Sequence, residues 1–358
     1  MTNEKVKSPI PATLIPGDGI GPEIVDAVKL VLEALGAPFA WDEKIAGMAA
    51  LAKGGDPLPQ ETLDSIRRTR LALKGPLTTP VGGGFRSVNV RLREEFGLYA
   101  NVRPVRTVVP GGRFEKIDLV LIRENLEGLY VGFEHYIPIG NDPHAVAIAS
   151  GVNTKAGAER VIRYAFEYAL TNGRKNVTIV HKANVMKALT GLFLEMGQKI
   201  AAEYKGRIDS NDRIIDACAM QLVLDPWQFD VLVTTNLFGD ILSDEMAGLV
   251  GGLGLAPGLC VGERQAMAQA THGSAPDIAG RNIANPYAMI MSGQMLLAWL
   301  GRRHKEPTAS AAARGIEAAV ARVIAEGKHL TRDLGGEAST TQMGDAIAAA
   351  VKGSGPVR

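Results

Sequence analysis

Two aspartates four residues apart are the first feature of this chain that could do chemistry. Asp240 and Asp244 follow the apolar run Val231 to Val233, a pattern typical of a buried strand that leads into a helix. At that spacing both carboxylates lie on one face of a helix. Because two like charges repel each other, a hard divalent cation, Mg²⁺ or Mn²⁺, could neutralise the pair with oxygen ligands. The alternative is that both aspartates lie at a helix start and cap it or offset its dipole.

Three arginines could grip a substrate that carries several carboxylates. Arg93 lies in a short polar segment, Arg103 precedes Pro104, and Arg123 follows the apolar run Leu119 to Ile122. Arginine binds carboxylates through paired N–H donors, and the ends of strands are where ligands gather in α/β proteins. The alternative for each arginine is a surface salt bridge.

Two small polar residues precede a short helix that carries Leu92 and Phe96. Ser87 and Asn89 are residue types that cap helices. They could also donate hydrogen bonds to a further carboxylate of the same substrate. Spacing alone leaves both interpretations open.

The elements that must position these residues alternate between strands and helices. Five short strand-like runs predict strands, at residues 12–15, 71–74, 119–122, 177–180 and 231–234. Helical periodicity begins at Pro22 with a stop at Gly36, and recurs at residues 156–170, 187–204, 286–300 and 309–326, with a short last helix after Ser339. This rhythm predicts an α/β protein with a partly parallel sheet. Residues 131–153 are expected to be extended and could form a protruding arm.

Composition narrows the class of protein. The 358 residues predict about two domains, and 46% of them are hydrophobic, as in an ordinary globular protein. With 39 basic against 38 acidic residues, no overall field attracts nucleic acid or a membrane surface. Two cysteines, Cys218 and Cys260, without a signal peptide or a membrane span in the sequence, indicate a soluble protein of the cytoplasm.

Six motifs in order along the chain resemble those of the β-decarboxylating dehydrogenases, the family of isocitrate, isopropylmalate and homoisocitrate dehydrogenases. They are PGDGIGPE at 16–23, LYANVRP at 98–104, RENLEGLY at 123–130, HKAN at 181–184, NLFGDILSD at 236–244 and HGSAPDIAG at 272–280. Within the family, Ser87 and Asn89 with Arg93 resemble the isocitrate branch, where the polar pair takes a third carboxylate. The isopropylmalate branch has apolar residues at these positions.

The resemblance implies a fold of two domains around a shared sheet. It divides the chain into a large domain of residues 1–99 and 252–358 and a small domain of residues 100–251, whose arm clasps a second subunit. Residues 17–21, Gly-Asp-Gly-Ile-Gly, lack the Gly-x-Gly-x-x-Gly spacing, so we reject a Rossmann fold. The resemblance implies that this segment is a tight turn from strand to helix.

The resemblance also implies a site shared between two subunits. Asp216 would join Asp240 and Asp244 as a metal ligand from the neighbouring chain. Lys182 would assist deprotonation of the substrate hydroxyl, and Tyr130 would return a proton to the enolate carbon. An unperturbed lysine or tyrosine has a pKa near 10, so nearby positive charge would be needed for such roles.

The cofactor implied by the resemblance is NAD, bound by the loop at 272–285 and the turn at 74–77. The implied contacts are Leu77, Asn236, His272, Gly273, Ser274, Ala275, Asp277, Ile278 and Asn285. Asp277 can accept hydrogen bonds from the adenosine ribose and repels the 2′-phosphate of NADP. NADP-dependent relatives carry Lys and Tyr where this chain has Asp277 and Ile278.

The resemblance therefore implies oxidative decarboxylation of isocitrate to 2-oxoglutarate and CO₂ by a homodimer or by a higher oligomer built from it. Homoisocitrate dehydrogenase is the closest alternative, followed by isopropylmalate dehydrogenase. From other classes, a regulatory subunit without activity and Mg²⁺-dependent phosphoryl transfer are the remaining alternatives.

Overall fold

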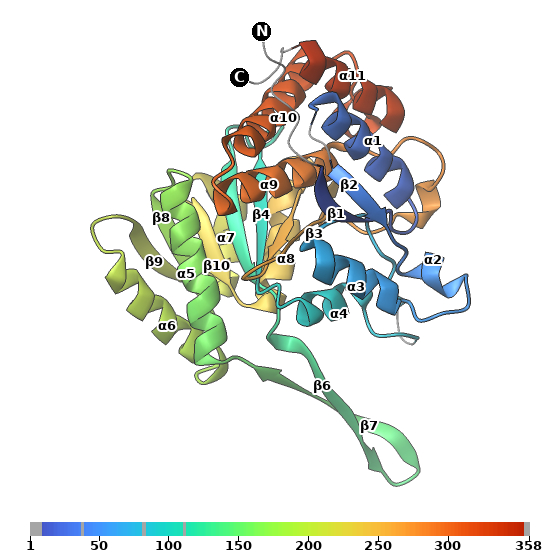
Figure 1. Ribbon diagram of the computed structural model, residues 1–358. Coiled ribbons are helices and arrows are strands. Elements are labelled where there is room, and N and C mark those ends of the chain that lie inside the picture. The colour runs from blue at the N-terminus through green and yellow to red at the C-terminus, as the bar shows by residue number, and fades with distance from the viewer. Residues whose placement is uncertain (1–8, 37–38, 81–83, 110–111, 354–358) are drawn as a thin grey trace.

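The computed structural model describes residues 9–36, 39–80, 84–109 and 112–353 (Figure 1). Residues 1–8 and 354–358, which belong to the predicted large domain, lie outside the described residues. Within them, ten strands form one mixed sheet and two more form a separate hairpin. The predicted α/β class is therefore confirmed.

The large sheet has the strand order β2-β1-β3-β12-β11-β4-β5-β10-β8-β9. Its strands are β1 (Ile10–Ile15), β2 (Phe39–Glu43), β3 (Leu71–Lys74), β4 (Ala100–Arg106), β5 (Asp118–Glu124), β8 (Asn176–His181), β9 (Asp209–Ile214), β10 (Val231–Thr234), β11 (Leu259–Val261) and β12 (Ala266–Ala268). Pairing is parallel on both sides and antiparallel from β12 through β11 and β4 to β5. The first five strands in this order come from residues 10–74 and 259–268, and the last five from 100–234. The division into two domains stays a prediction.

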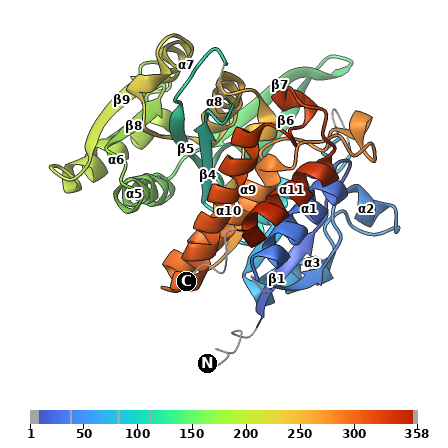
Figure 2. The same cartoon turned by 90° about the horizontal axis from the view of Figure 1, so that it is seen from above.

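Helices cover both faces of the sheet. They are α1 (Gly21–Ala34), α2 (Met48–Leu51), α3 (Gln60–Thr69), α4 (Val88–Glu95), α5 (Lys155–Thr171), α6 (Leu189–Glu203), α7 (Ile215–Leu224), α8 (Asn236–Leu249), α9 (Tyr287–Arg303), α10 (Pro307–Glu326) and α11 (Thr340–Gly353). Figure 2 shows α5 on one side of β5 and β8, with α7 and α8 on the other. The side chains of Val120, Leu121 and Ile122 in β5 are fully buried between these layers.

A hairpin of β6 (Gly128–Ile139) and β7 (Asp142–Val152) projects from the body of the molecule (Figure 1). Its outer part exposes large apolar side chains, among them Phe133, Tyr136 and Ile139. The predicted protruding arm is confirmed as an element, while its contact with a second subunit stays a prediction.

The five predicted strands and the predicted helices are present, with ends that shift by a few residues. The last helix is longer than expected, because α11 continues for 14 residues after Ser339. Gly36, with φ of 65°, follows the end of α1 as predicted. Among the described residues, none of the helices combines the length and hydropathy that a membrane span requires.

Candidate active site

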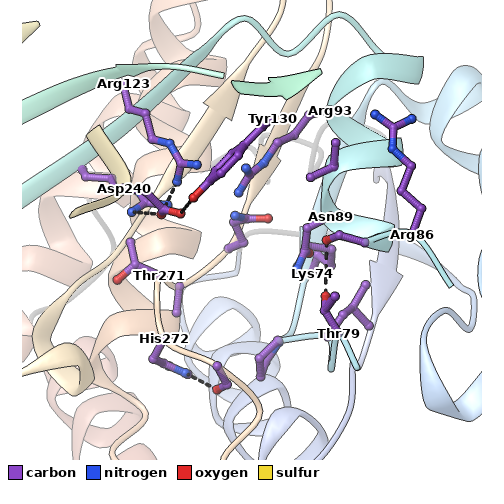
Figure 3. Close-up of a pocket in the computed structure, with 18 of the residues that line it drawn as sticks. Lys74, Thr79, Arg86, Asn89, Arg93, Arg123, Tyr130, Asp240, Thr271 and His272 are labelled. Atoms are coloured by element: carbon purple, nitrogen blue, oxygen red, sulfur yellow. Dashed lines mark hydrogen bonds and ion pairs between the residues drawn. The ribbon is translucent and has the colours of Figure 1, made fainter. Parts of the chain in front are cut away.

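A cavity of about 680 Å³ is lined by residues that follow β3 and β12 and by residues of β4, β5 and α8 (Figure 3). Arg93, Arg103 and Arg123 line it together, as do Ser87, Asn89, Tyr130 and Asp240. They come from β4, β5, β6, α4 and α8 and from the residue before α4. Seven residues predicted from motifs far apart in the sequence thus face one space.

Arg103 and Arg123 are buried cations held by Asp240. Nη1 of Arg123 donates to Asp240 Oδ1, and Nη1 of Arg103 donates to the same oxygen at 3.3 Å. Burial, together with the nearby positive charges of Arg103 and Arg93, lowers the pKa of Arg123 to about 9. Arg123 still carries its charge at neutral pH. The surface salt bridge that was the alternative for these two residues is wrong, because both side chains are buried.

Asp240 and Asp244 have environments that move their pKa values apart. Burial raises the pKa of Asp240, but Arg123 and Arg103 outweigh that effect and the net shift is downward. Burial raises the pKa of Asp244; the charge of Arg103 offsets part of this rise, and the negative charge of Asp240 adds to it. The Asp244 side chain is half exposed, and its carboxylate lies 3.9 Å from Nη1 of Arg103. A cation between the two carboxylates would relieve this repulsion.

The position of this pair within α8 corrects one expectation. The helix begins at Asn236 and has no acidic residue in its first turn, so Asp240 and Asp244 lie in the second and third turns. The alternative that they cap the helix is therefore wrong. Their spacing still places both carboxylates on one face.

Within this chain, the candidate metal ligands that lie together are two carboxylates, those of Asp240 and Asp244. The described residues contain no group of three or more His, Cys, Asp or Glu side chains that could hold a metal ion. Asp216 does not line the cavity; its Oδ1 accepts a hydrogen bond from Nζ of Lys182 at 2.5 Å. That contact with Lys182 lowers the pKa of Asp216. The other ligands of a divalent cation at Asp240 and Asp244 would have to come from substrate, water or a second chain.

Tyr130 reaches Asp240 from the base of the hairpin. Its hydroxyl donates to Oδ2 of Asp240 at 3.0 Å, and the guanidinium carbon of Arg123 lies 5.7 Å from the ring centroid. Burial and then the charge of Asp240 raise the pKa of Tyr130. The phenol therefore keeps its proton at neutral pH and can act as a donor.

The helix α4 presents polar groups that lack protein partners. Ser87 occupies the capping position, but its side chain makes no capping hydrogen bond; Oγ1 of Thr79 donates to its Oγ at 3.2 Å. Oδ1 of Asn89 and Nε of Arg93 are buried without a hydrogen-bond partner within the described part of the chain. Buried polar groups are nearly always hydrogen-bonded, so these atoms indicate a missing polar ligand. The capping interpretation of Ser87 is wrong.

The segment 16–22 is a tight turn that holds the two predicted cofactor segments together. The backbone N–H of Asp18 donates to Pro76 O, and that of Ile20 donates to Ser274 O. A Cβ on Gly19, whose φ is 59°, would lie 2.0 Å from Ser274 O. Only glycine permits this approach, so the glycines serve packing between loops.

The predicted cofactor residues fall into two groups. Leu77, His272 and Gly273 line the cavity, whereas Asn236, Ser274, Ala275, Asp277, Ile278 and Asn285 do not. Asp277 is exposed in the short 3₁₀ helix Pro276–Ile278, and Nδ2 of Asn285 donates to Asp333 at 2.8 Å. Burial lowers the pKa of His272, whose Nδ1 lies 2.9 Å from Gly273 O. Its buried Nε2 has no partner among the described residues and is therefore a free acceptor.

Sequence reasoning missed several residues that line the cavity, namely Thr79, Arg86, Glu134, Gln269 and Thr271, and it included Lys74 only as part of the predicted cofactor turn at 74–77. Lys74 is 2% exposed at the end of β3, where burial and then the charge of Arg93 lower its pKa to about 7. Lys74 is the last residue of β3, and Arg123 is the last but one of β5, so both cations lie at strand ends.

Comparisons with known proteins agree with this geometry. The family described as Isocitrate/isopropylmalate dehydrogenase matches residues 12–347. An Arabidopsis thaliana mitochondrial protein, isocitrate dehydrogenase [NAD] catalytic subunit 5, is 47% identical over 343 residues, which cover 95% of this chain and 88% of that protein.

A 3-isopropylmalate dehydrogenase from Archaeoglobus fulgidus is 46% identical over 341 residues, covering 94% and 97% of the two chains. The crystal structure of isocitrate dehydrogenase from Methylococcus capsulatus superposes with a TM-score of 0.90 at 54% identity, covering 96% of this chain and 99% of that one. The predicted family and fold are confirmed: this chain belongs to the isocitrate/isopropylmalate dehydrogenase family.

Proposed function

We propose that this protein is an NAD-dependent isocitrate dehydrogenase, which converts isocitrate to 2-oxoglutarate and CO₂ with a divalent cation. The observation that carries the proposal is the polar end of the cavity, where Ser87 and Asn89 lie near Arg93 and Oδ1 of Asn89 lacks a partner. Rotation of the Asn89 amide would turn Nδ2 toward a carboxylate. The alkyl group of isopropylmalate would leave the same polar atoms buried without hydrogen bonds.

The charge of the cavity supports a substrate with three carboxylates. Arg93, Arg103 and Arg123 all line it, and isocitrate carries three carboxylates at neutral pH. Arg103 and Arg123 adjoin Asp240 and would bind the carboxylates that all substrates of the family share. Arg93 adjoins the polar end and would bind the carboxylate that distinguishes isocitrate.

Two proton-transfer groups fit the two steps of the reaction. Tyr130 keeps its proton through its raised pKa and would return it to the enolate carbon after CO₂ leaves. Lys182, which the family resemblance makes the base, contacts Asp216 and does not line the cavity of its own chain. We therefore assign both Lys182 and Asp216 to the site of a second subunit in a homodimer.

Two bound groups would complete this site. The contribution of a divalent cation at Asp240 and Asp244 is positive charge beside the substrate oxygen. NAD would accept hydride, and Leu77, His272 and Asp277 would hold it; the free acceptor Nε2 of His272 suits an amino group. The buried, free Cys218 and Cys260 support placement in the reducing cytoplasm.

An absorbance assay for NADH tests the proposal on the purified chain. Isocitrate, homoisocitrate and isopropylmalate are each supplied with NAD or NADP, with and without Mn²⁺. We expect the highest kcat/KM with isocitrate, NAD and Mn²⁺. A higher kcat/KM with another substrate would make that compound, rather than isocitrate, the proposed substrate. If none of the three substrates is turned over, a regulatory subunit without activity would be favoured.

A pair of variants tests the polar end directly. Ser87→Leu combined with Asn89→Leu removes hydrogen bonds to a charged carboxylate, which typically costs roughly tenfold to a hundredfold in kcat/KM. Isocitrate turnover should fall by that factor, and isopropylmalate should come closer to parity. Arg103→Met is the matched control, because it should impair all three substrates alike. Unchanged isocitrate efficiency in the double variant would contradict the assignment.

A further inference from the structure

Arg123 crosses the start of α8 through a space that glycine leaves open. The Arg123 side chain is 1% exposed, and a Cβ added at Gly239 would lie 2.6 Å from its Cγ and 2.8 Å from its Cβ. Any larger residue at position 239 would displace the arginine. The path of this side chain is therefore fixed by packing before its polar end is considered.

The guanidinium of Arg123 is then held along one edge by Asn236. Oδ1 of Asn236 accepts hydrogen bonds from Nε of Arg123 at 3.1 Å and from Nη2 at 2.8 Å. Nη1, on the other edge, donates to Asp240. Two acceptors on opposite sides of a planar group restrict its rotation, so Arg123 is oriented without a ligand.

Asn236 is itself oriented by the backbone. Nδ2 donates to the carbonyl oxygen of Glu127 at 3.0 Å, so that Oδ1 must face Arg123. The Asn236 side chain is buried and does not line the cavity. Its amide oxygen and one of its two amide hydrogens are engaged with protein atoms, and the buried side chain presents no surface to the cavity for a cofactor to contact.

We propose that Asn236 is a positioning residue for the substrate, which acts by orienting Arg123, and that it does not bind NAD. The inference rests on the proposed function, in which Arg123 binds a substrate carboxylate. It replaces the cofactor contact that the family resemblance implies for Asn236. The kinetic consequence is specific: loss of Asn236 should weaken use of the substrate and spare use of the cofactor.

Steady-state kinetics of Asn236→Ala test the proposal with the substrate that the wild type uses best. We expect KM for that substrate to rise at least about tenfold, and KM for NAD to stay within about twofold. Asn236→Asp, which keeps the acceptor for Arg123, should restore most of the loss. Asn176→Ala is the matched control. It also removes a hydrogen-bonded Asn side chain, but Asn176 forms its hydrogen bonds with Thr178 and Asn211, at the amino end of β8.

A double-mutant cycle separates positioning of Arg123 from general damage to the fold. In an Arg123→Met background, Asn236→Ala should cause little further change in kcat/KM, because its partner is already absent. A rise in KM for NAD, additive losses, or no effect of Asn236→Ala would each overturn the proposal. If Asn236→Ala does not fold, the proposal is tested with Asn236→Asp alone. A tenfold rise in the substrate KM of Asn236→Asp would contradict the proposal, because this variant keeps the acceptor for Arg123. Preference of the wild type for another substrate would instead overturn the proposed function alone.

Discussion

Lys74 shows how burial can make a single charge responsive to pH. Its pKa falls from an ordinary value of 10.5 to about 7, so the folded protein releases this proton well before the unfolded chain does. Below about pH 7 both states hold the proton, and the folded state bears the full cost of a buried charge. Between about pH 7 and pH 10 only the unfolded state holds it, so the Lys74 contribution makes the protein more stable as pH rises.

We predict that Lys74→Met removes this dependence. The free energy of unfolding of the wild type relative to Lys74→Met should increase by up to about 1.4 kcal/mol per pH unit between about pH 7 and pH 10. Urea unfolding at several pH values measures it. Lys53→Met, at an exposed lysine, is the control and should change no slope. A constant difference between wild type and Lys74→Met across that range would contradict the shifted pKa.

The choice of cofactor also depends on single residues. Asp277 is exposed beside Ile278 in the 3₁₀ helix Pro276–Ile278, where its charge would repel a 2′-phosphate. Asp277→Lys combined with Ile278→Tyr should shift the ratio of kcat/KM toward NADP by at least about tenfold, or about 1.4 kcal/mol. Initial rates with both cofactors measure this ratio. Equal wild-type efficiency with NAD and NADP would refute the role of Asp277.

For single residues, the motifs predicted which side chains belong to the site better than they predicted which side chains contact one another. Arg123, Tyr130 and Asp240 were predicted as members of one site, and all three line one cavity. The partners of Arg123 could not be predicted, because Asn236 lies 113 positions away and meets it only through the pairing of β5 with β10. The low pKa of Lys74 likewise depends on burial, which no local pattern reports.

Among the elements, the hairpin of β6 and β7 leaves most of its outer residues exposed, because the rest of this chain does not cover them. Phe133, Tyr136 and Ile139 are exposed on it, and apolar surface of this kind is typical of a protein interface. Replacing all three with Ser should shift the chain from dimer to monomer in light scattering after size-exclusion chromatography. Met48→Ser, at an exposed apolar residue of α2, is the control. A monomeric wild type, or a triple variant that stays dimeric, would exclude the predicted clasp.

Periodicity predicted most elements because it depends on near neighbours. The strands β5 and β10 contain continuous apolar runs, and β8 has only Thr178 between its apolar residues, as expected for strands buried on both faces. Strand order was not predictable from the pattern, since β3 pairs with β12 across almost 200 residues. The turn of α8 on which Asp240 lies was also missed, because the sequence does not show where the helix starts.

For the whole molecule, the separation of Lys182 and Asp216 from their own cavity has a direct consequence. If each site takes these residues from the neighbouring subunit, one hybrid dimer site can hold every functional group. Mixing inactive Asp216→Asn chains with inactive Tyr130→Phe chains should therefore restore part of the activity. Co-purification with two affinity tags isolates the hybrids before the assay. Hybrids that form and remain inactive would argue against a shared site.

The strand order also has a consequence for how the chain folds during its synthesis on the ribosome. The half of the sheet that contains β4, β5, β8, β9 and β10 is complete once residue 234 has emerged. The other half begins earlier, with β1, but lacks β11 and β12 until residue 268 is made. We expect the middle of the chain to become protease-resistant first, while the earlier-made β1, β2 and β3 wait for strands synthesised almost 200 residues later.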